Sequence, residues 1–183
     1  MRNFVISAVI MLTLVFFISA YLGYSYAKLE PGLEEGLKQF FESFKGFLNN
    51  PLILMLIIFA NNAAKALIAM LAGFYFGIFP VVFVALNGYI VGAVISLREP
   101  EMGTLGVVMA LLPHGVLEIP AIILACSYGV WLGYRFYKAL FNGEEFKPYL
   151  MHALKVYVKI ILPVLFVAAF VEAFITPLLV FHS

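Results

Sequence analysis

The sequence predicts an all-α membrane protein, a polytopic bundle of about five transmembrane helices, and three observations carry this prediction. Hydrophobic residues make up 64% of the 183 residues and charged residues only 11%, whereas about 25% of the residues of a soluble domain are charged. The mean hydropathy is +1.06. The apolar residues lie in runs as long as a bilayer is thick, without the short alternating segments of a membrane β-barrel, so we expect the spans to be helices.

Composition also limits the chemistry and the partners of the chain. The net charge of +1 comes with no basic run, so we expect no nucleic-acid partner. Cys126 is the single cysteine and is interpreted as a small core residue, which forms no internal disulfide and no thiol pair for a metal. The chain has no aspartate, so any carboxylate chemistry must use glutamate. We expect no cofactor.

The first apolar run covers residues 4–26 and follows Arg2. Ser25 and Ala27 place small residues where a signal peptidase would cut. The run is nevertheless longer than the about 7 to 15 residues of a signal-peptide core, so we interpret it as a retained first transmembrane helix.

The segment 29–50 has a different composition, rich in glutamate, lysine and phenylalanine. One face carries Leu33, Leu37, Phe40, Phe44 and Phe47 at helical spacing, and the other largely carries Glu34, Glu35, Lys38, Glu42 and Lys45. This segregation predicts an amphipathic external helix that lies at the membrane surface or packs over the bundle.

The remaining chain, 51–183, is expected to form the helical bundle of a single membrane domain, 1–183. Apolar runs at 51–79 and 81–97 predict a hairpin around Pro80, and a polar turn follows at 98–103. The next stretch, 104–137, is too long for one span at about 1.5 Å per residue. Because Pro113 and Pro120 each remove a backbone donor, we expect a half-helix to Leu112, a break or re-entrant turn at 113–115, and a full span to Tyr137. The last run covers 154–181.

Basic residues indicate the orientation of these spans. If the spans alternate, one side carries Arg2, Arg135, Lys138, Lys147, Lys155 and Lys159, and the other carries Lys28, Lys38, Lys45 and Arg98. The positive-inside rule then predicts a multi-pass protein of the cell membrane with a cytoplasmic N-terminus and an external C-terminus.

Three spans carry small residues at every fourth position. These are Ala69, Gly73 and Gly77; Gly88, Gly92 and Ser96; and Ala125, Gly129 and Gly133. Such stripes let helix backbones approach closely in lipid. They are expected to pack the bundle or to build the face of a homodimer, and a homo-oligomer is therefore expected.

Seven polar residues interrupt the apolar spans: Asn61, Asn62, Lys65, Asn87, His114, Glu118 and Glu172. A charge at mid-membrane costs about 2.5 to 3.5 kcal/mol on insertion scales, so each residue should face the bundle interior and find a partner. Their depths predict a single buried polar layer. The expected ion pair joins Lys65 to Glu118 or Glu172.

This polar layer has three interpretations. Structural ion pairing and helix capping is the first, and proton or ion handling is the second. The third is a metal-dependent catalytic site, for which His114 and Glu118, four positions apart, are weak candidate ligands because a metal site normally takes three or more. The sequence contains no nucleophile elbow, phosphate loop or zinc-protease helix.

An ordered set of motifs between about residue 50 and residue 177 resembles the stage II sporulation protein M family. The matching residues are Asn61, Asn62, Gly73, Gly77, Asn87, Gly88, Gly92, Pro113, His114, Gly115, Glu118, Gly129 and the segment 172–177. The most specific part is Pro-His-Gly-x-x-x-Glu, which ends at Glu118.

The resemblance implies a small polytopic membrane protein that, in spore formers, works with peptidoglycan-degrading partners as an anchor or scaffold. Members also occur in organisms that do not sporulate, and no catalytic role comes with the matching residues. We therefore expect a non-enzymatic scaffold whose partners are the lipid bilayer and membrane or external proteins. The alternatives are a small transporter or channel that uses Lys65, His114 and Glu118 and, ranked last, a metal-dependent intramembrane hydrolase.

Overall fold

The computed structural model describes residues 2–44 and 50–176, and every element in these ranges is helical. The elements in chain order are α1 (Arg2–Tyr26), η1 (Ala27–Leu29), α2 (Pro31–Phe44), α3 (Pro51–Leu71), η3 (Ala72–Phe74), α4 (Ile78–Pro113), η4 (His114–Glu118), α5 (Ile119–Asn142), α6 (Lys147–Val156), η5 (Tyr157–Ile161) and α7 (Leu162–Phe174). Of these, η1 and η3 are 3₁₀ turns, whereas η4 and η5 are π-helical turns. The predicted all-α fold is confirmed.

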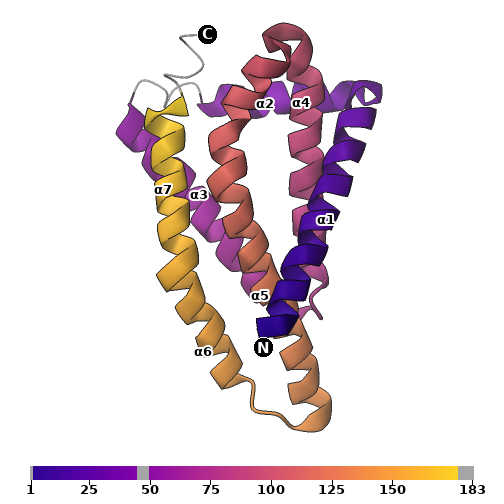
Figure 1. Cartoon of the computed structure of the whole chain (residues 1–183), viewed down its shortest axis with the longest axis vertical. Coiled ribbons are helices and arrows are strands. Elements are labelled where there is room, and N and C mark those ends of the chain that lie inside the picture. The colour runs from indigo at the N-terminus through magenta and orange to yellow at the C-terminus, as the bar shows by residue number, and fades with distance from the viewer. Residues whose placement is uncertain (1, 45–49, 177–183) are drawn as a thin grey trace.

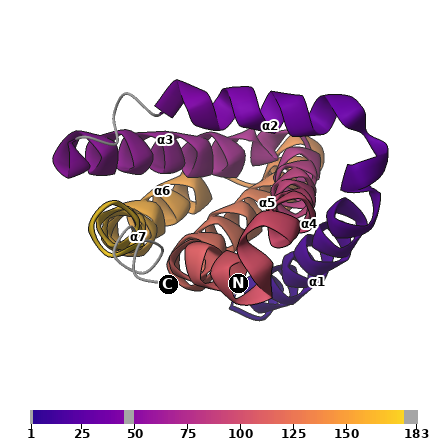
Figure 2. The ribbon, with the colours of Figure 1, turned by 90° about the horizontal axis from the view of Figure 1, so that it is seen from above.

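Five helices in the described ranges are long and apolar enough to cross a membrane. They cover Arg2–Leu29, Pro51–Phe74, Ile78–Gly103, Gly115–Asn142 and Lys147–Phe174. The spans alternate in direction, so α1 begins at the end of the molecule that we call the lower end, and α7 finishes at the upper end (Figure 1). The amphipathic α2 lies across the upper end, roughly perpendicular to the spans (Figures 1 and 2). Of the predicted amphipathic segment, residues 45–49 lie outside the described residues.

The second span begins and ends with clear local signals. Asn50 caps α3, because its side-chain oxygen accepts hydrogen bonds from the backbone N–H groups of Leu52 at 3.1 Å and Ile53 at 3.2 Å. The chain then reverses at residues 75–77, where Phe76 and Gly77 have φ values of 52° and 76°. The hairpin predicted around Pro80 is therefore shifted, because Pro80 lies in the first turn of α4, where its missing N–H leaves no hydrogen bond unmade.

The predicted polar turn at 98–103 contains a reversal of the chain, whereas the predicted break at 113–115 is wrong. The polar segment 98–103 continues α4, and the reversal occurs at Gly103, whose φ of 71° and ψ of 163° suit only glycine. The expected break at 113–115 is instead the π-helical turn η4, and the helix then continues to Asn142. Both π-helical turns end two residues before a proline, Pro120 or Pro163. Since proline crowds the carbonyl four positions earlier, a wider turn at that point relieves the clash.

The last span begins earlier than residue 154, at Lys147, and runs through α6, η5 and α7. A loop around Gly143, with a φ of 69°, joins it to α5 at the lower end. Glu144 fixes this loop, since its carboxylate lies 3.2 Å from the Arg135 guanidinium and 3.4 Å from the Lys138 ammonium. The guanidinium of Arg135 also lies 4.4 Å from the centre of the Tyr149 ring.

The core of the bundle lies around α5, the most buried span. Trp131, Leu132 and Ala125 on α5 are almost completely buried and share one cluster with Met70 of α3. On the side of α3 that faces the bundle, the hydroxyl of Tyr157 donates a hydrogen bond of 2.7 Å to the backbone oxygen of Ala63. This part of the bundle interior is therefore packed by apolar side chains, and one hydrogen bond joins the second span to the last.

The small-residue stripes form two close helix contacts within the chain. A Cβ on Gly88 or Gly92 would collide with the backbone of α1, and one on Gly23 of α1 would collide with the backbone of α4. In the second contact, a Cβ on Gly73 would collide with α5, and one on Gly133 would collide with η3 and the turn after it. The stripes therefore pack the bundle, and these faces are covered by the chain's own helices.

Candidate functional site

The seven polar residues of the predicted layer do not share one environment. Asn62 and Glu118 are buried, with 8% and 4% of their surface exposed. Asn87 and Glu172 are half-buried, whereas Asn61 and Lys65 are exposed. The prediction that every one of these side chains faces the interior is therefore wrong for Asn61 and Lys65. The side chain of His114 lies outside the described residues.

Glu118 is the most deeply buried charged residue in the described part of the chain. It is the last residue of η4, which packs against α4, α5 and α7. A π-helical turn changes the direction of the side chains that follow it and occurs often at functional sites. The structure therefore places one carboxylate of the predicted layer inside the bundle.

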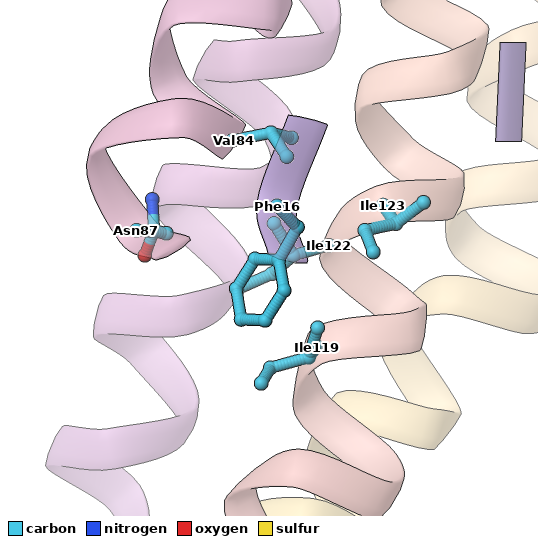
Figure 3. A pocket seen from close by; sticks show the side chains of 6 residues that line it. All are labelled: Phe16, Val84, Asn87, Ile119, Ile122 and Ile123. Carbon is cyan, nitrogen blue, oxygen red and sulfur yellow. The ribbon is translucent and has the colours of Figure 1, made fainter. Parts of the chain in front are cut away.

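Asn87 lines a small hollow between α1, α4 and α5 (Figure 3). The other lining residues are Phe16, Val84, Ile119, Ile122 and Ile123. The side-chain amide of Asn87 donates a hydrogen bond of 2.7 Å to the backbone oxygen of Phe83 on its own helix. The hollow has a volume of ≈ 10 Å³, room for about one water, whereas ligand pockets measure about 300 to 1,000 Å³. The hollow is therefore too small for an organic ligand.

Asn61 and Lys65 belong to the outer face of α3. This face consists of the exposed residues Ile53, Leu56, Ala60, Asn61, Ala64, Lys65 and Ile68. The opposite face of the helix carries the buried residues Met55, Asn62, Ala63, Ala66, Ala69 and Met70. The Asn61 amide contacts the side-chain oxygen of Asn62 at 3.4 Å, so a polar row joins the two faces.

The predicted ion pair of Lys65 with Glu118 or Glu172 is wrong. Within the described residues no ion pair joins Lys65 to either carboxylate, and the outward direction of Lys65 explains why. Lys65 lies about 21 Å along α3 from Pro51 and about 14 Å from Phe74, at the rise of an ideal helix. A charged residue is therefore placed well inside a span, on the side away from the bundle.

Sequence reasoning missed an aromatic and basic cluster at the lower end. Trp131 and His152 have ring centres 6.0 Å apart, and Arg135 lies between the rings of Trp131, Tyr134 and Tyr149. The signal in the sequence was the concentration of tyrosine, tryptophan and arginine near the ends of two successive spans, which is typical of a membrane interface. The cluster fixes the loop between α5 and α6.

Metal binding has limited support in the part of the chain that the structure describes. No three side chains of histidine, cysteine, aspartate or glutamate gather there closely enough to hold an ion. Of the two candidate ligands, only the side chain of Glu118 falls in that part.

Comparisons with known proteins agree with the architecture. The sequence model of the stage II sporulation protein M family matches residues 9–177. Two uncharacterised proteins of Methanocaldococcus jannaschii are similar to the chain, one 32% identical over 122 residues and the other 31% identical over 141 residues. These matches cover 64% and 74% of this chain, and 68% and 62% of the respective relatives. No solved structure matches the chain.

Proposed function

The chain belongs to the stage II sporulation protein M family, and from this premise we propose that it is a non-enzymatic membrane scaffold, which anchors partner proteins at the bilayer. The observation that carries the proposal is the division of the polar residues between the interior and the outer face of α3. An enclosed reaction site would bring polar groups together around a cavity. Here two of them point outward from a tightly packed bundle, where another protein could contact them.

The amphipathic α2 gives the proposed scaffold a second contact surface. It lies across the upper end of the bundle, and in the described structure it packs mainly against η1 (Figures 1 and 2). Glu34 and Glu35 are exposed on it, and Leu33 and Leu37 are half-buried. A helix of this kind can lie in the membrane interface and present its charged face to proteins outside the bilayer.

Charge also supports an orientation for the scaffold. Arg2, Arg135, Lys138 and Lys147 all lie at or near the lower end, and α2 lies at the upper end (Figure 1). With the positive-inside rule, the lower end and the N-terminus are cytoplasmic, and α2 is external. Partners that contact α2 would then be external proteins.

Site-specific cross-linking in native membranes tests the scaffold. Gly36 on α2 has no neighbour within 4 Å of an added Cβ, so a photoreactive residue fits there without disturbing the fold. We expect the same protein partner to be cross-linked in independent preparations. The control position is Tyr21 on α1, which lies within the first span and is 70% exposed. Absence of any recurring partner at Gly36, together with its absence in affinity purification, would contradict the proposal.

A second candidate function is proton or ion transport, and buried Glu118 is the observation that favours it. A carboxylate inside a span is commonly a functional group in transporters. Flux of protons or metal cations into liposomes that contain the purified protein is the measurement. If ions or protons pass through this site, Glu118→Gln should reduce the flux. An unchanged flux in that variant would exclude Glu118 from the transport mechanism.

A further inference from the structure

The outer face of α3 combines two features that occur together where transmembrane helices pack. Ala60 and Ala64 are four positions apart at the centre of the face, and Asn61 and Lys65 follow them along one edge. We propose that this face binds a transmembrane helix of another protein that carries a carboxylate, and the proposal rests on the scaffold function above. The argument depends on the charge of Lys65 and on the shape of the surface beside it.

Lys65 is poorly placed to reach water on its own. Its Cα lies about 14 Å along the helix from the lower end of the span, and side chains on an α-helix tilt toward the helix N-terminus. Because α3 runs downward, this tilt directs Lys65 toward the middle of the membrane. The ammonium group of Lys65 is therefore directed away from the lipid headgroups at the lower end, which are the nearer ones.

Lys159 provides the contrasting case within the same chain. It is also exposed within a span, but its span runs upward, so the same tilt directs the side chain toward the lower headgroups. Its exposed neighbours, Val158 and Ile160, are large and apolar. Lys159 lies about 18 Å from the lower end of its span, and its side chain is directed toward that end, whereas the side chain of Lys65 is directed away from its nearer end.

The surface beside Lys65 is shaped to accept a helix. Ala60 and Ala64 form a shallow strip, and the bulkier Leu56 and Ile68, exposed by 50% and 59%, flank it above and below. Small residues at this spacing let a second backbone approach, so that a side chain on the partner could meet Lys65 and Asn61 over a short distance. The Asn61 amide and the Lys65 ammonium would each donate a hydrogen bond to a carboxylate.

A second copy of this chain does not supply that carboxylate. Aspartate is absent, and the glutamates outside the span interiors are Glu30, Glu34, Glu35, Glu42, Glu99, Glu101, Glu144 and Glu145. Glu118 is buried in the bundle, and Glu172 is in the last turn of α7 at the upper end, far from the depth of Lys65. A symmetric contact through the outer face of α3 would also place Lys65 opposite its own copy. Charge complementarity therefore favours a different protein.

The test uses the full chain in phosphatidylcholine vesicles with a synthetic single-span helix of leucine and alanine. One peptide carries a glutamate at the depth of Lys65, and a matched peptide carries glutamine there. Association is measured by energy transfer between labels on the protein and on the peptide. We expect the glutamate peptide to bind about tenfold more tightly than the glutamine peptide, the size of effect that one polar contact between helices gives in a membrane.

Variants of the protein then locate the contact. Lys65→Leu should abolish the preference for glutamate, whereas Lys159→Leu, the matched control, should leave it unchanged. Equal binding of both peptides to the unmodified chain, or a preference that survives in Lys65→Leu, overturns the proposal. Because leucine is suited to a lipid-facing position, the variant is expected to fold, and its circular dichroism spectrum checks this.

Two further measurements examine the other occupants of the face. Energy transfer between labelled copies of the chain that is lost in Lys65→Leu would identify a second copy. Binding of labelled phosphatidylglycerol that is lost in the same variant would identify an anionic lipid headgroup. Either result, in place of glutamate-peptide binding, overturns the proposal.

Cross-linking from Ala64 in native membranes separates this inference from the scaffold function. Cross-links that recur at Gly36 but not at Ala64, with no peptide preference, would remove the α3 site and leave the scaffold standing. Absence of protein cross-links at both positions would contradict the scaffold and the α3 site together.

Discussion

The contact between α1 and α4 and the outer face of α3 use similar residues with opposite results. Between α1 and α4, Gly88 and Gly92 bring two backbones of the same chain into contact. On α3, Ala60 and Ala64 have the same spacing but are exposed. The residues beside them differ, because the first contact is flanked mainly by apolar side chains and the second by Asn61 and Lys65.

The difference shows that a small-residue stripe indicates a close contact without identifying the partner. At Gly88 and Gly92 the backbone of α1 approaches so closely that an added Cβ would collide with it. Alanine permits a looser approach, and the adjacent polar groups then decide which helix is accepted. The first contact should therefore determine the stability of the bundle, and the second should determine binding.

The largest expected effect comes from adding one methyl group to the first contact. In Gly92→Ala the new Cβ would collide with the backbone oxygen of Ala20, so the two helices must separate. We expect a loss of about 3 kcal/mol in the free energy of unfolding, at the upper end of the usual cost of overpacking. Unfolding in mixed detergent micelles measures this. Gly36→Ala, where no atom lies within 4 Å of the added Cβ, is the matched control and should not destabilise the chain.

An intermediate effect is expected on the side of α3 that faces the bundle. Tyr157→Phe removes the hydroxyl that donates to the backbone oxygen of Ala63 at 2.7 Å. The same unfolding experiment should show a loss of about 1 kcal/mol, which is the usual value for a buried hydrogen bond. Tyr21→Phe, at a 70% exposed position, is the control. Equal losses in the two variants would show that the hydroxyl of Tyr157 contributes nothing specific.

A smaller effect on stability is expected on the outer face of α3. Ala64→Leu fills no space inside the bundle, so the free energy of unfolding should change by less than about 0.5 kcal/mol. The same variant should weaken binding of the glutamate peptide, because the larger side chain holds the partner helix away. A loss of stability as large as that of Gly92→Ala would mean that the two surfaces do not differ in role.

The smallest effect is expected at the upper end of the contact between α1 and α4. The hydroxyl of Tyr24 donates a hydrogen bond of 2.9 Å to the Glu99 carboxylate, but the pair is exposed to solvent. Tyr24→Phe should leave the thermal unfolding temperature in detergent unchanged within error. A clear decrease would assign part of the strength of this contact to its polar end as well as to its glycines.

The number of spans, the crosswise α2 and the positions of the glycine contacts could be predicted from the sequence. Each depends on a local quantity: the length of an apolar run, the segregation of charge on α2, or the spacing of Gly88 and Gly92. These quantities do not require knowledge of which helix lies beside which. The contact partners of the glycines, in contrast, came only from the structure.

The direction of Lys65 and the π-helical turn at 114–118 could not be predicted, for physical reasons. Both faces of α3 are mostly apolar and both carry an asparagine, Asn61 or Asn62, so its sequence gives little indication of which face meets the bundle. Pro113 and Pro120 predict a break, but a π-helical turn lets the helix continue past them. The reversal itself lies at Gly103, the last residue of the predicted polar turn 98–103.

The contact between α1 and α4 also sets an order of events during synthesis. Tyr24 and Glu99, which meet at the upper end of this contact, are 75 positions apart in the chain. At about 5 to 20 residues per second, the ribosome needs about 4 to 15 s to make the partner after α1 has entered the membrane. During that interval α1 lacks the helix that packs against Gly23, although the second span, α3, is made in the meantime. Until the third span, α4, is inserted, proteins that assist membrane insertion can bind the face of α1 that α4 later covers.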